Sequence, residues 1–105
     1  YLPTLNTPAN RAFLQAYRKK YPSAGLPNQP AAATYDAVYL LRDVIAKAGP
    51  KRQDVRRALA RIGSQDAPFR GVTGTVAFDI RGDVPNQAVY IGIVQDGGVH
   101  LARTR

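Results

Sequence analysis

Residues 31–48 read AAATYDAVYLLRDVIAKA, and this stretch decides the fold because apolar side chains surround it on almost every side. A helix that is apolar all round is typical of a buried position, and we expect it to run from residue 31 or 34 to residue 48. Gly49 and Pro50 follow in the order that usually ends a helix. Its charged residues leave it short of the roughly 20 apolar residues that a membrane span needs. A small domain cannot cover such a helix by itself, so we expect the rest of a longer chain, or a second copy, to pack against it.

Two shorter amphipathic helices flank this stretch. The first is expected to start at Thr7, a hydroxyl residue followed by proline, and to end at Pro22. Prolines stiffen the loop over residues 22–30 that leads to the central helix. The third helix is expected over residues 53–62, where apolar residues recur at helical spacing and Gly63 follows as a stop signal.

The pattern then changes from helical to β-rich. Residues 75–79 predict a short strand, and residues 79–83 predict a turn. A second strand is expected over residues 88–95, followed by a hairpin turn at 96–98 and a return strand over 99–102. The fold class is therefore α/β, with three helices followed by a short β-strand region that ends in a hairpin.

The composition limits the possible functions. The chain has 105 residues, enough for one domain at most, and a formal net charge of +8. It has no Cys, which excludes disulfides and thiolate metal sites, and its single histidine, His100, cannot form a histidine cluster. We therefore expect no metal and no cofactor. The charge fits a nucleic acid or an anionic membrane as partner, or a piece of a larger protein whose remainder is acidic, and we favour the last interpretation.

No residue pattern indicates an enzyme. Ser23 and Ser64 stand in loops without the strand–turn–helix context of a catalytic serine. Asp79 and Asp83 form the one candidate carboxylate pair, but their glycine-containing turn favours a role in capping backbone N–H groups. The same turn contains an Arg-Gly-Asp tripeptide over residues 81–83, which we interpret as turn chemistry rather than as a cell-adhesion signal. We predict no catalytic residue.

Two further patterns have both a functional and a structural interpretation. Residues 71–74, GVTG, suggest a phosphate-binding loop but lack the lysine and the helix that follow such a loop, so a tight backbone bend is favoured. The third helix has a basic face that would suit phosphates, although solvated arginines are the commoner explanation. Tyr35 and Tyr39 are interpreted as packing residues rather than as a base-stacking platform. The basic face comprises Lys51, Arg52, Arg56, Arg57 and Arg61.

Five blocks of sequence, in this order and spacing, resemble one family. They are residues 13–21 (FLQAYRKKY), 32–41 (AATYDAVYLL), 45–49 (IAKAG), 55–59 (VRRAL) and 69–83 (FRGVTGTVAFDIRGD). Together they are similar to the C-terminal part of the branched-chain amino acid and amide-binding proteins of ABC uptake systems, which have the type I periplasmic binding protein fold. The resemblance extends over residues 8–102, nearly the whole chain.

The resemblance implies a two-lobed protein whose lobes close around a cleft when ligand bridges them. Residues 1–105 would form a single C-terminal fragment of it. Residues 8–78 would supply helices and a strand to the first lobe, residues 79–90 the last hinge crossing, and residues 91–105 the terminal hairpin toward the second lobe. The hinge residues are expected to be Asp79, Gly82 and Asp83.

The function implied is that of a solute-binding receptor for an ABC uptake transporter, for branched-chain or other amino acids or amides. The family's main ligand contacts lie in parts absent from this chain. The loop before the central helix lies near the cleft, so Pro30, Ala31 and Ala32 are the candidate ligand-binding residues, with a stiff helix lead-in as the structural alternative. The partners expected are the solute, a membrane permease and, for the fragment, a second copy; nucleic acid is not expected.

The implied location is periplasmic or extracellular, with or without a membrane anchor in the parent protein. The first residues carry no basic or apolar leader, so we interpret the chain as processed or trimmed from a longer one. Two other functions stay open. One is a ligand-sensing receptor domain of a signalling protein with the same fold, and the other is a basic nucleic-acid-binding module.

Overall fold

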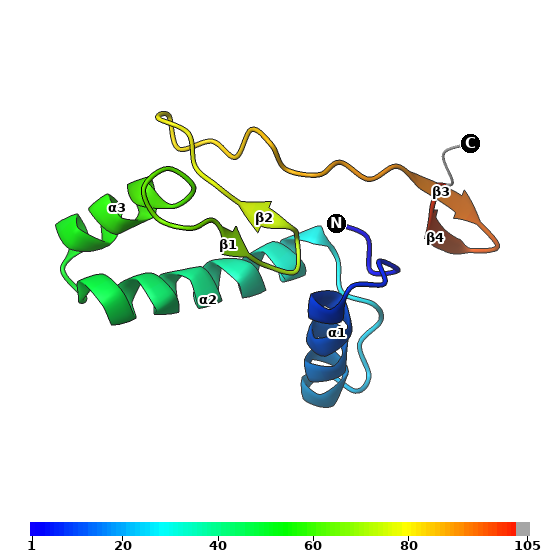
Figure 1. The fold of residues 1–105 in the computed structure, drawn as a ribbon. Coiled ribbons are helices and arrows are strands. Elements are labelled where there is room, and N and C mark those ends of the chain that lie inside the picture. The colour runs from blue at the N-terminus through cyan, green and yellow to red at the C-terminus, as the bar shows by residue number, and fades with distance from the viewer. Residues whose placement is uncertain (103–105) are drawn as a thin grey trace.

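Three helices and two small antiparallel strand pairs make up residues 1–102, which are the part of the chain that the computed structural model describes (Figure 1). The helices are α1 (Pro8–Lys20), α2 (Gln29–Ala48) and α3 (Arg52–Arg61), and the strands are β1 (Phe69–Arg70), β2 (Thr75–Val76), β3 (Gly92–Gln95) and β4 (Gly98–Leu101). The predicted order of three helices followed by short strands with a terminal hairpin is confirmed. The last residues of the predicted terminal segment, 103–105, lie outside the described residues.

Side-chain caps set where the first two helices begin. The Thr7 hydroxyl accepts a hydrogen bond from the Asn10 backbone N–H at 3.1 Å, as the sequence predicts for α1. The prediction that α2 begins at residue 31 or 34 is wrong, because the Asn28 side chain accepts from the Ala31 N–H at 3.1 Å and starts the helix at Gln29. Pro30 then falls in the first turn, where its missing N–H has no helical partner to lose.

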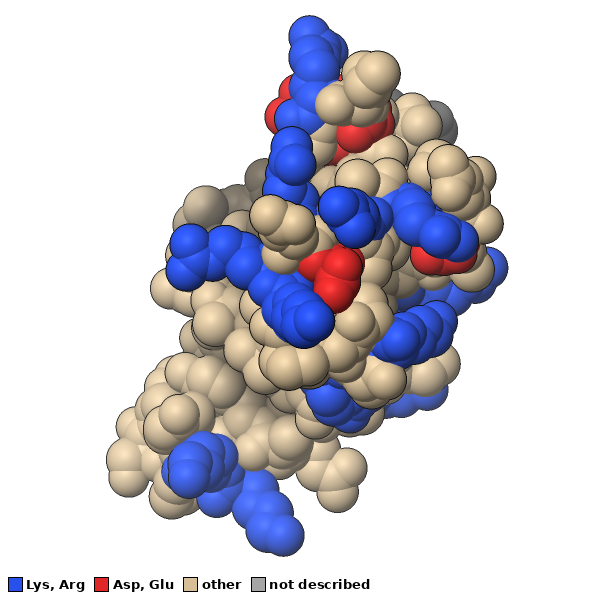
Figure 2. All heavy atoms as spheres, turned by 90° about the vertical axis from the view of Figure 1, so that its left-hand side faces the viewer, with Lys and Arg blue, Asp and Glu red and all other residues tan. Residues whose placement is uncertain are grey.

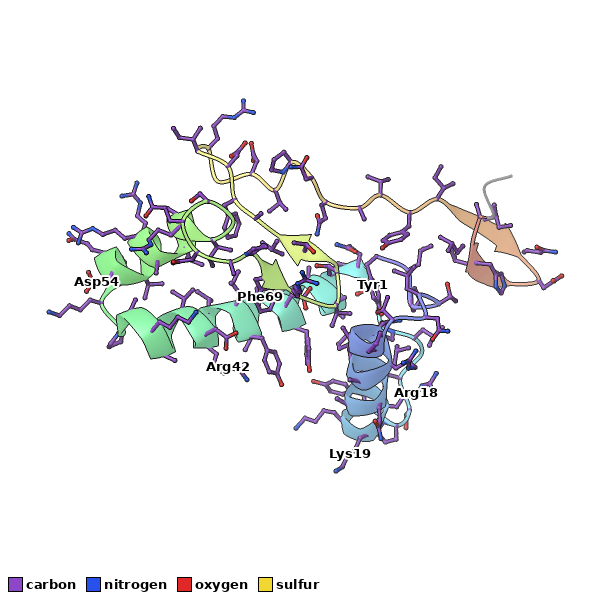
Figure 3. The ribbon with its side chains drawn as sticks, in the orientation of Figure 1. Tyr1, Arg18, Lys19, Arg42, Asp54 and Phe69 are labelled. Atoms are coloured by element: carbon purple, nitrogen blue, oxygen red, sulfur yellow. The ribbon has the colours of Figure 1, made fainter. Side chains whose placement is uncertain are left out.

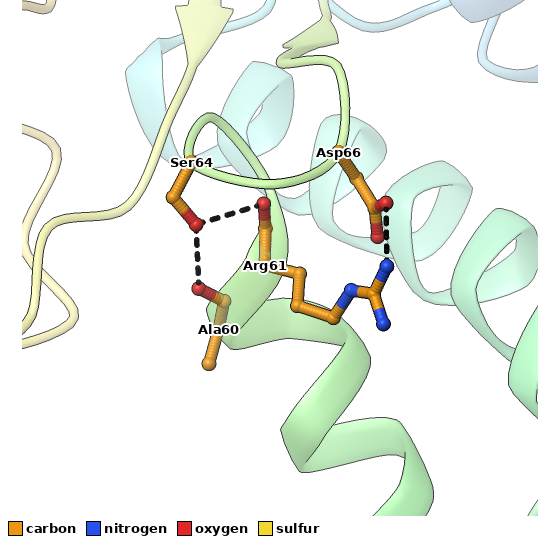
Figure 4. A network of polar contacts seen from close by, with 4 residues as sticks. All are labelled: Ala60, Arg61, Ser64 and Asp66. Carbon is orange, nitrogen blue, oxygen red and sulfur yellow. Dashed lines mark hydrogen bonds and ion pairs between the residues drawn. The ribbon is translucent and has the colours of Figure 1, made fainter.

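The end of α3 is closed by its own following turn (Figure 4). The Ser64 hydroxyl donates to the carbonyl oxygens of Ala60 and Arg61 at 3.4 and 3.1 Å, and the Arg61 guanidinium lies 3.2 Å from the Asp66 carboxylate. The two hydroxyl bonds supply partners to carbonyls of the last helical turn, and the ion pair joins the helix end to the turn. The helix begins and ends one residue earlier than predicted, and Ser64 has a structural role there.

The first strand pair corrects the sequence interpretation. Of the strand predicted over residues 75–79, only Thr75 and Val76 form strand pairing. Their partner is β1, for which the sequence carries no prediction. After Val76 the chain leaves β1, and the Phe78 N–H donates to the Ile62 carbonyl at 3.0 Å. The described residues therefore contain four short strands rather than three.

The terminal hairpin is confirmed but is shorter than predicted. Residues 88–91 of the expected strand are not part of β3, which pairs with β4 only from Gly92 to Gln95. Asp96 and Gly97 form the turn with φ angles of 51° and 75°, as a tight two-residue hairpin requires. Figure 1 shows the hairpin at the end of an extended segment, apart from α2 and α3.

Two small clusters of buried residues form the core. One lies where α2, α3 and β2 meet, and Phe69 packs against it from β1 (Figure 3). The other joins α1 to the start of α2. The first cluster comprises Leu40, Val44, Ile62 and Val76, and the second comprises Phe13, Ala32 and Val72.

One side of α2 is left exposed by residues 1–102. Its buried residues, at four-residue spacing, form one stripe, whereas Val38, Leu41 and Ile45 are 60%, 41% and 43% exposed. The exposed surface of the chain is 8189 Å², against about 5,800 Å² for a compact monomer of this mass. The radius of gyration is 15.8 Å, against about 13 Å for a compact domain of this length. The chain buries less of itself than a complete domain does.

Candidate functional site

A buried carboxylate in the middle of α2 organises the segment that faces it. The Asp36 carboxylate accepts hydrogen bonds from the backbone N–H groups of Val72 and Thr73 at 2.7 and 2.8 Å, and from the Thr73 hydroxyl at 2.7 Å. Asp36 is only 5% exposed, so these bonds form away from water. They fix the tight connection between β1 and β2 to the face of α2.

This contact explains the glycine-rich segment that follows β1. A Cβ atom on Gly71 would collide with the Asp36 carboxylate, so only glycine allows the approach. Gly74 has a φ of 123°, which side chains rarely adopt. The backbone-bend interpretation is confirmed: two amides of the segment already bind Asp36 and are not free to hold a phosphate.

Sequence reasoning missed Asp36 as the key polar residue. One signal could have found it, because Asp36 falls on the same four-residue spacing as the buried Ala32, Leu40 and Val44. A carboxylate on an otherwise apolar stripe needs a bonded partner. A glycine-rich turn later in the chain is a natural source of free amides.

The three candidate ligand-binding residues lie in the first turn of α2. Pro30 is exposed, and Ala31 is half-buried. Ala32 has no exposed surface, since it belongs to the cluster of Phe13 and Val72. A ligand that approached this turn would therefore meet Pro30 and Ala31, and ligand contact by the turn stays a prediction.

The three candidate hinge residues form one closed turn after β2. The Asp79 carboxylate accepts from the N–H groups of Arg81 and Asp83 at 2.8 and 2.9 Å, which is the capping role expected for it. The Asp79 N–H also donates to the Asp83 carbonyl at 2.9 Å, and Gly82 has a φ of 86°. This turn is where the chain leaves the helices and enters the extended segment toward β3 (Figure 1).

Tyr35 and Tyr39 lie one turn apart on α2 with their rings tilted against each other, and Tyr35 packs against the second core cluster. The rings of Tyr35 and Tyr39 lie 4.6 Å apart, and the Arg42 guanidinium lies 4.6 Å from the centre of the Tyr39 ring. The neighbouring Tyr39 hydroxyl, and then partial burial, raise the pKa of Tyr35 above 10.0. Tyr35 therefore packs against the second core cluster, as the sequence analysis favours, whereas Tyr39 is 37% exposed and contacts Tyr35 and Arg42.

Residues 1–102 contain neither a cluster of metal-ligating side chains nor a membrane-spanning helix. In this range, no three His, Asp or Glu side chains come together in a way that could hold a metal ion. No helix in the same range is both long and apolar enough to cross a bilayer.

Two solved structures have the same arrangement over almost the whole chain. The leucine-binding protein LivK of Thermotoga maritima is 27% identical, with a TM-score of 0.74 over 98% of this chain and 28% of LivK. An ABC transporter substrate-binding protein of Desulfitobacterium hafniense, solved in complex with Leu, is 29% identical, with a TM-score of 0.77 over 95% of this chain and 28% of that protein. This chain thus spans about 28% of the length of each.

The match to a family model agrees with these structures. A comparison with curated protein sequences gave no match. Residues 1–98 match the model that describes periplasmic binding proteins. The resemblance predicted from the sequence blocks is confirmed, and so is the partial fold. The chain belongs to the periplasmic binding protein family.

Proposed function

We propose that this chain is the C-terminal segment of a solute-binding receptor that captures an amino acid or amide for an ABC uptake transporter. The receptor acts in the periplasm or outside the cell, passes its solute to a membrane permease, and is not an enzyme. The observation that carries this proposal is the exposed crossing between the two parts of the chain. A body of three helices and one strand pair is joined to a separate hairpin by a single extended segment.

The crossing fits a hinge between lobes. Val89 and Ile91 in the extended segment are 89% and 68% exposed. Among residues 1–102, only the start of the segment is covered, where Val84 packs against the first core cluster. In a two-lobed protein, parallel crossings and the second lobe would cover the rest of the segment. The turn at residues 79–83 takes up the change of direction, and closure around a solute stabilises one lobe orientation.

The first turn of α2 supports an apolar subsite. Pro30 and Ala31 present no polar side chain, and the Asn28 cap fixes the turn in place. Such a surface suits the hydrocarbon part of an aliphatic solute. The polar ends of the solute would then be bound by residues outside this chain.

Solute binding is tested on the full-length protein that carries this chain. We expect leucine, isoleucine, valine or a short aliphatic amide to raise the melting temperature in a thermal-shift panel. A ligand at about 100 times its Kd stabilises the folded form by about 2.7 kcal/mol, which is readily measured. The proposal fails if no amino acid or amide in the panel shifts the melting temperature.

The subsite is tested by a matched pair of variants on the same helix. Ala31→Phe should raise the Kd of the solute about tenfold, because a large ring would fill the space that the solute's aliphatic chain occupies. Ala33→Phe is the control, since Ala33 is exposed in the next positions of α2. If the two variants bind the solute with equal affinity, Ala31 does not line the ligand site.

A further inference from the structure

An apolar groove bordered by arginines lies between α3 and the segment that follows β2. Its volume is ≈ 510 Å³, within the range of sites that bind small ligands and side chains. Its floor is apolar, and three arginines stand among the residues that line it. The floor comprises Val55, Leu59, Ala60 and Phe78, and the arginines are Arg52, Arg56 and Arg81.

These arginines are only weakly engaged within the chain. Among residues 1–102, no carboxylate lies within 4.0 Å of Arg52 or Arg56, whereas the neighbouring Arg57 lies 3.6 Å from the Asp54 carboxylate. Arg81 is 80% exposed, and its Nε atom is 3.8–3.9 Å from its nearest carboxylates. Figure 2 faces this end of the molecule and shows many more Lys and Arg than Asp and Glu. Asp79 also lines the groove, and its carboxylate accepts from the N–H groups of Arg81 and Asp83. With three arginines and one aspartate, the groove keeps unused donors and a net positive charge.

We propose that this groove binds an acidic peptide segment of a partner protein, with an apolar side chain on the floor and carboxylates on the arginines. The planar guanidinium donates two parallel hydrogen bonds to a carboxylate, which is a geometry that lysine cannot offer. Ile80, next to Arg81, is fully exposed and extends the apolar surface toward the peptide. Charge and apolar surface together select acidic residues that alternate with large apolar ones.

The apolar floor distinguishes this partner from the other polyanions. A nucleic acid would engage the arginines through its phosphates and leave the floor without a partner. A flat anionic membrane would meet the exposed arginines but would not enter a concave groove. A peptide side chain fills the floor while its neighbouring carboxylates reach the rim.

The test uses the full-length protein and a fluorescein-labelled peptide of alternating glutamate and leucine, followed by fluorescence anisotropy. We expect the double variant Arg52→Gln/Arg56→Gln to bind the peptide about tenfold more weakly, which corresponds to a loss of about 1.4 kcal/mol of binding free energy. Arg57→Gln removes one positive charge from the same helix outside the groove and should change the affinity less than about twofold, so it is compared with Arg52→Gln and Arg56→Gln taken singly. Ile80→Ser should lower the affinity for the peptide, while the salt dependence of that affinity stays unchanged.

Control peptides and vesicles decide between the partners. Replacing the glutamates by glutamine, or the leucines by serine, should each abolish most of the binding. The proposal would be overturned if the Arg57 variant and the double variant lost equal affinity for the peptide. It would also be overturned if replacing the leucines by serine left the affinity unchanged. Binding to phosphatidylglycerol vesicles without binding to the peptide would also overturn it, in favour of a lipid surface. Solute affinity, measured on the Arg52 and Arg56 double variant and on Arg57→Gln, should stay unchanged, which separates this result from the proposed function.

Discussion

Removing the buried Asp36 carboxylate should cost more stability than removing an exposed carboxylate from the same helix. Its three hydrogen bonds, at 2.7–2.8 Å, join residues that are 36 and 37 positions apart in the sequence. Asp36→Ala leaves the buried N–H groups of Val72 and Thr73 without acceptors. A buried donor left without an acceptor costs about 1–3 kcal/mol, so the two N–H groups together should cost about 2–6 kcal/mol. This is a large part of the roughly 5–15 kcal/mol by which a domain is stable.

The assay is urea unfolding of the full-length protein, followed by circular dichroism. Asp43→Ala is the matched control, because Asp43 lies on the same helix and pairs only with Arg42, whose side chain is 64% exposed. An exposed pair of this kind contributes about 0–1 kcal/mol. Thr73→Val should fall between the two, at about 1 kcal/mol, since it removes one of the three bonds. If Asp36→Ala lowers the free energy of unfolding no more than Asp43→Ala does, Asp36 does not hold the connection between β1 and β2.

Three other predictions concern packing and helix ends, each measured by urea unfolding unless stated. Gly71→Ala should destabilise the protein by about 1–3 kcal/mol because its Cβ would meet Asp36, whereas Gly25→Ala, with open space around it, should be nearly neutral. Asn28→Ala should cost about 1 kcal/mol through the lost cap of α2, and an unchanged midpoint would contradict that role. Replacing Leu41 and Ile45 by lysine should keep the isolated 105-residue chain monomeric in size-exclusion chromatography but destabilise the full-length protein, and the opposite pattern would show that nothing packs there.

The helices were predictable because their signals are local. Thr7 before Pro8 marks the start of α1, and Gly49 before Pro50 marks the end of α2. Both signals act within one helical turn. The error at the start of α2 came from treating Pro30 as a loop residue. The Asn28 side chain, two residues earlier, makes Pro30 acceptable in the first helical turn.

The strands were less predictable because their partners are distant or brief. β1 and β2 have two residues each, too few for an alternating pattern to appear. The hairpin of β3 and β4 was predictable, since Asp96 and Gly97 carry a turn signal of their own. Residues 88–91 lie outside β3, although the Ile91 carbonyl accepts from the Ala102 N–H at 2.8 Å and continues the hairpin by one bond.

The site divides in the same way. The turn at residues 79–83 follows from its aspartates and glycine, and the structure shows the expected capping. The link from Asp36 to Val72 could not be read from local pattern, because it depends on α2 and the β1–β2 connection meeting in space. Polar residues inside an apolar stripe are the sequence signal for such a link, although they do not name the partner.

The uncovered surface and the family match lead to one physical conclusion about this chain. It exposes about 2,400 Å² more than a compact monomer of its mass, and a standard protein–protein interface buries only about 1,200–2,000 Å² in total. An apolar helix face and a free-standing hairpin make up part of that excess, and relatives are several times longer. Hydrophobic burial is the main source of folding free energy. The described residues therefore depend on further protein surface for much of their stability, and the solute capture that we propose would require that surface as well.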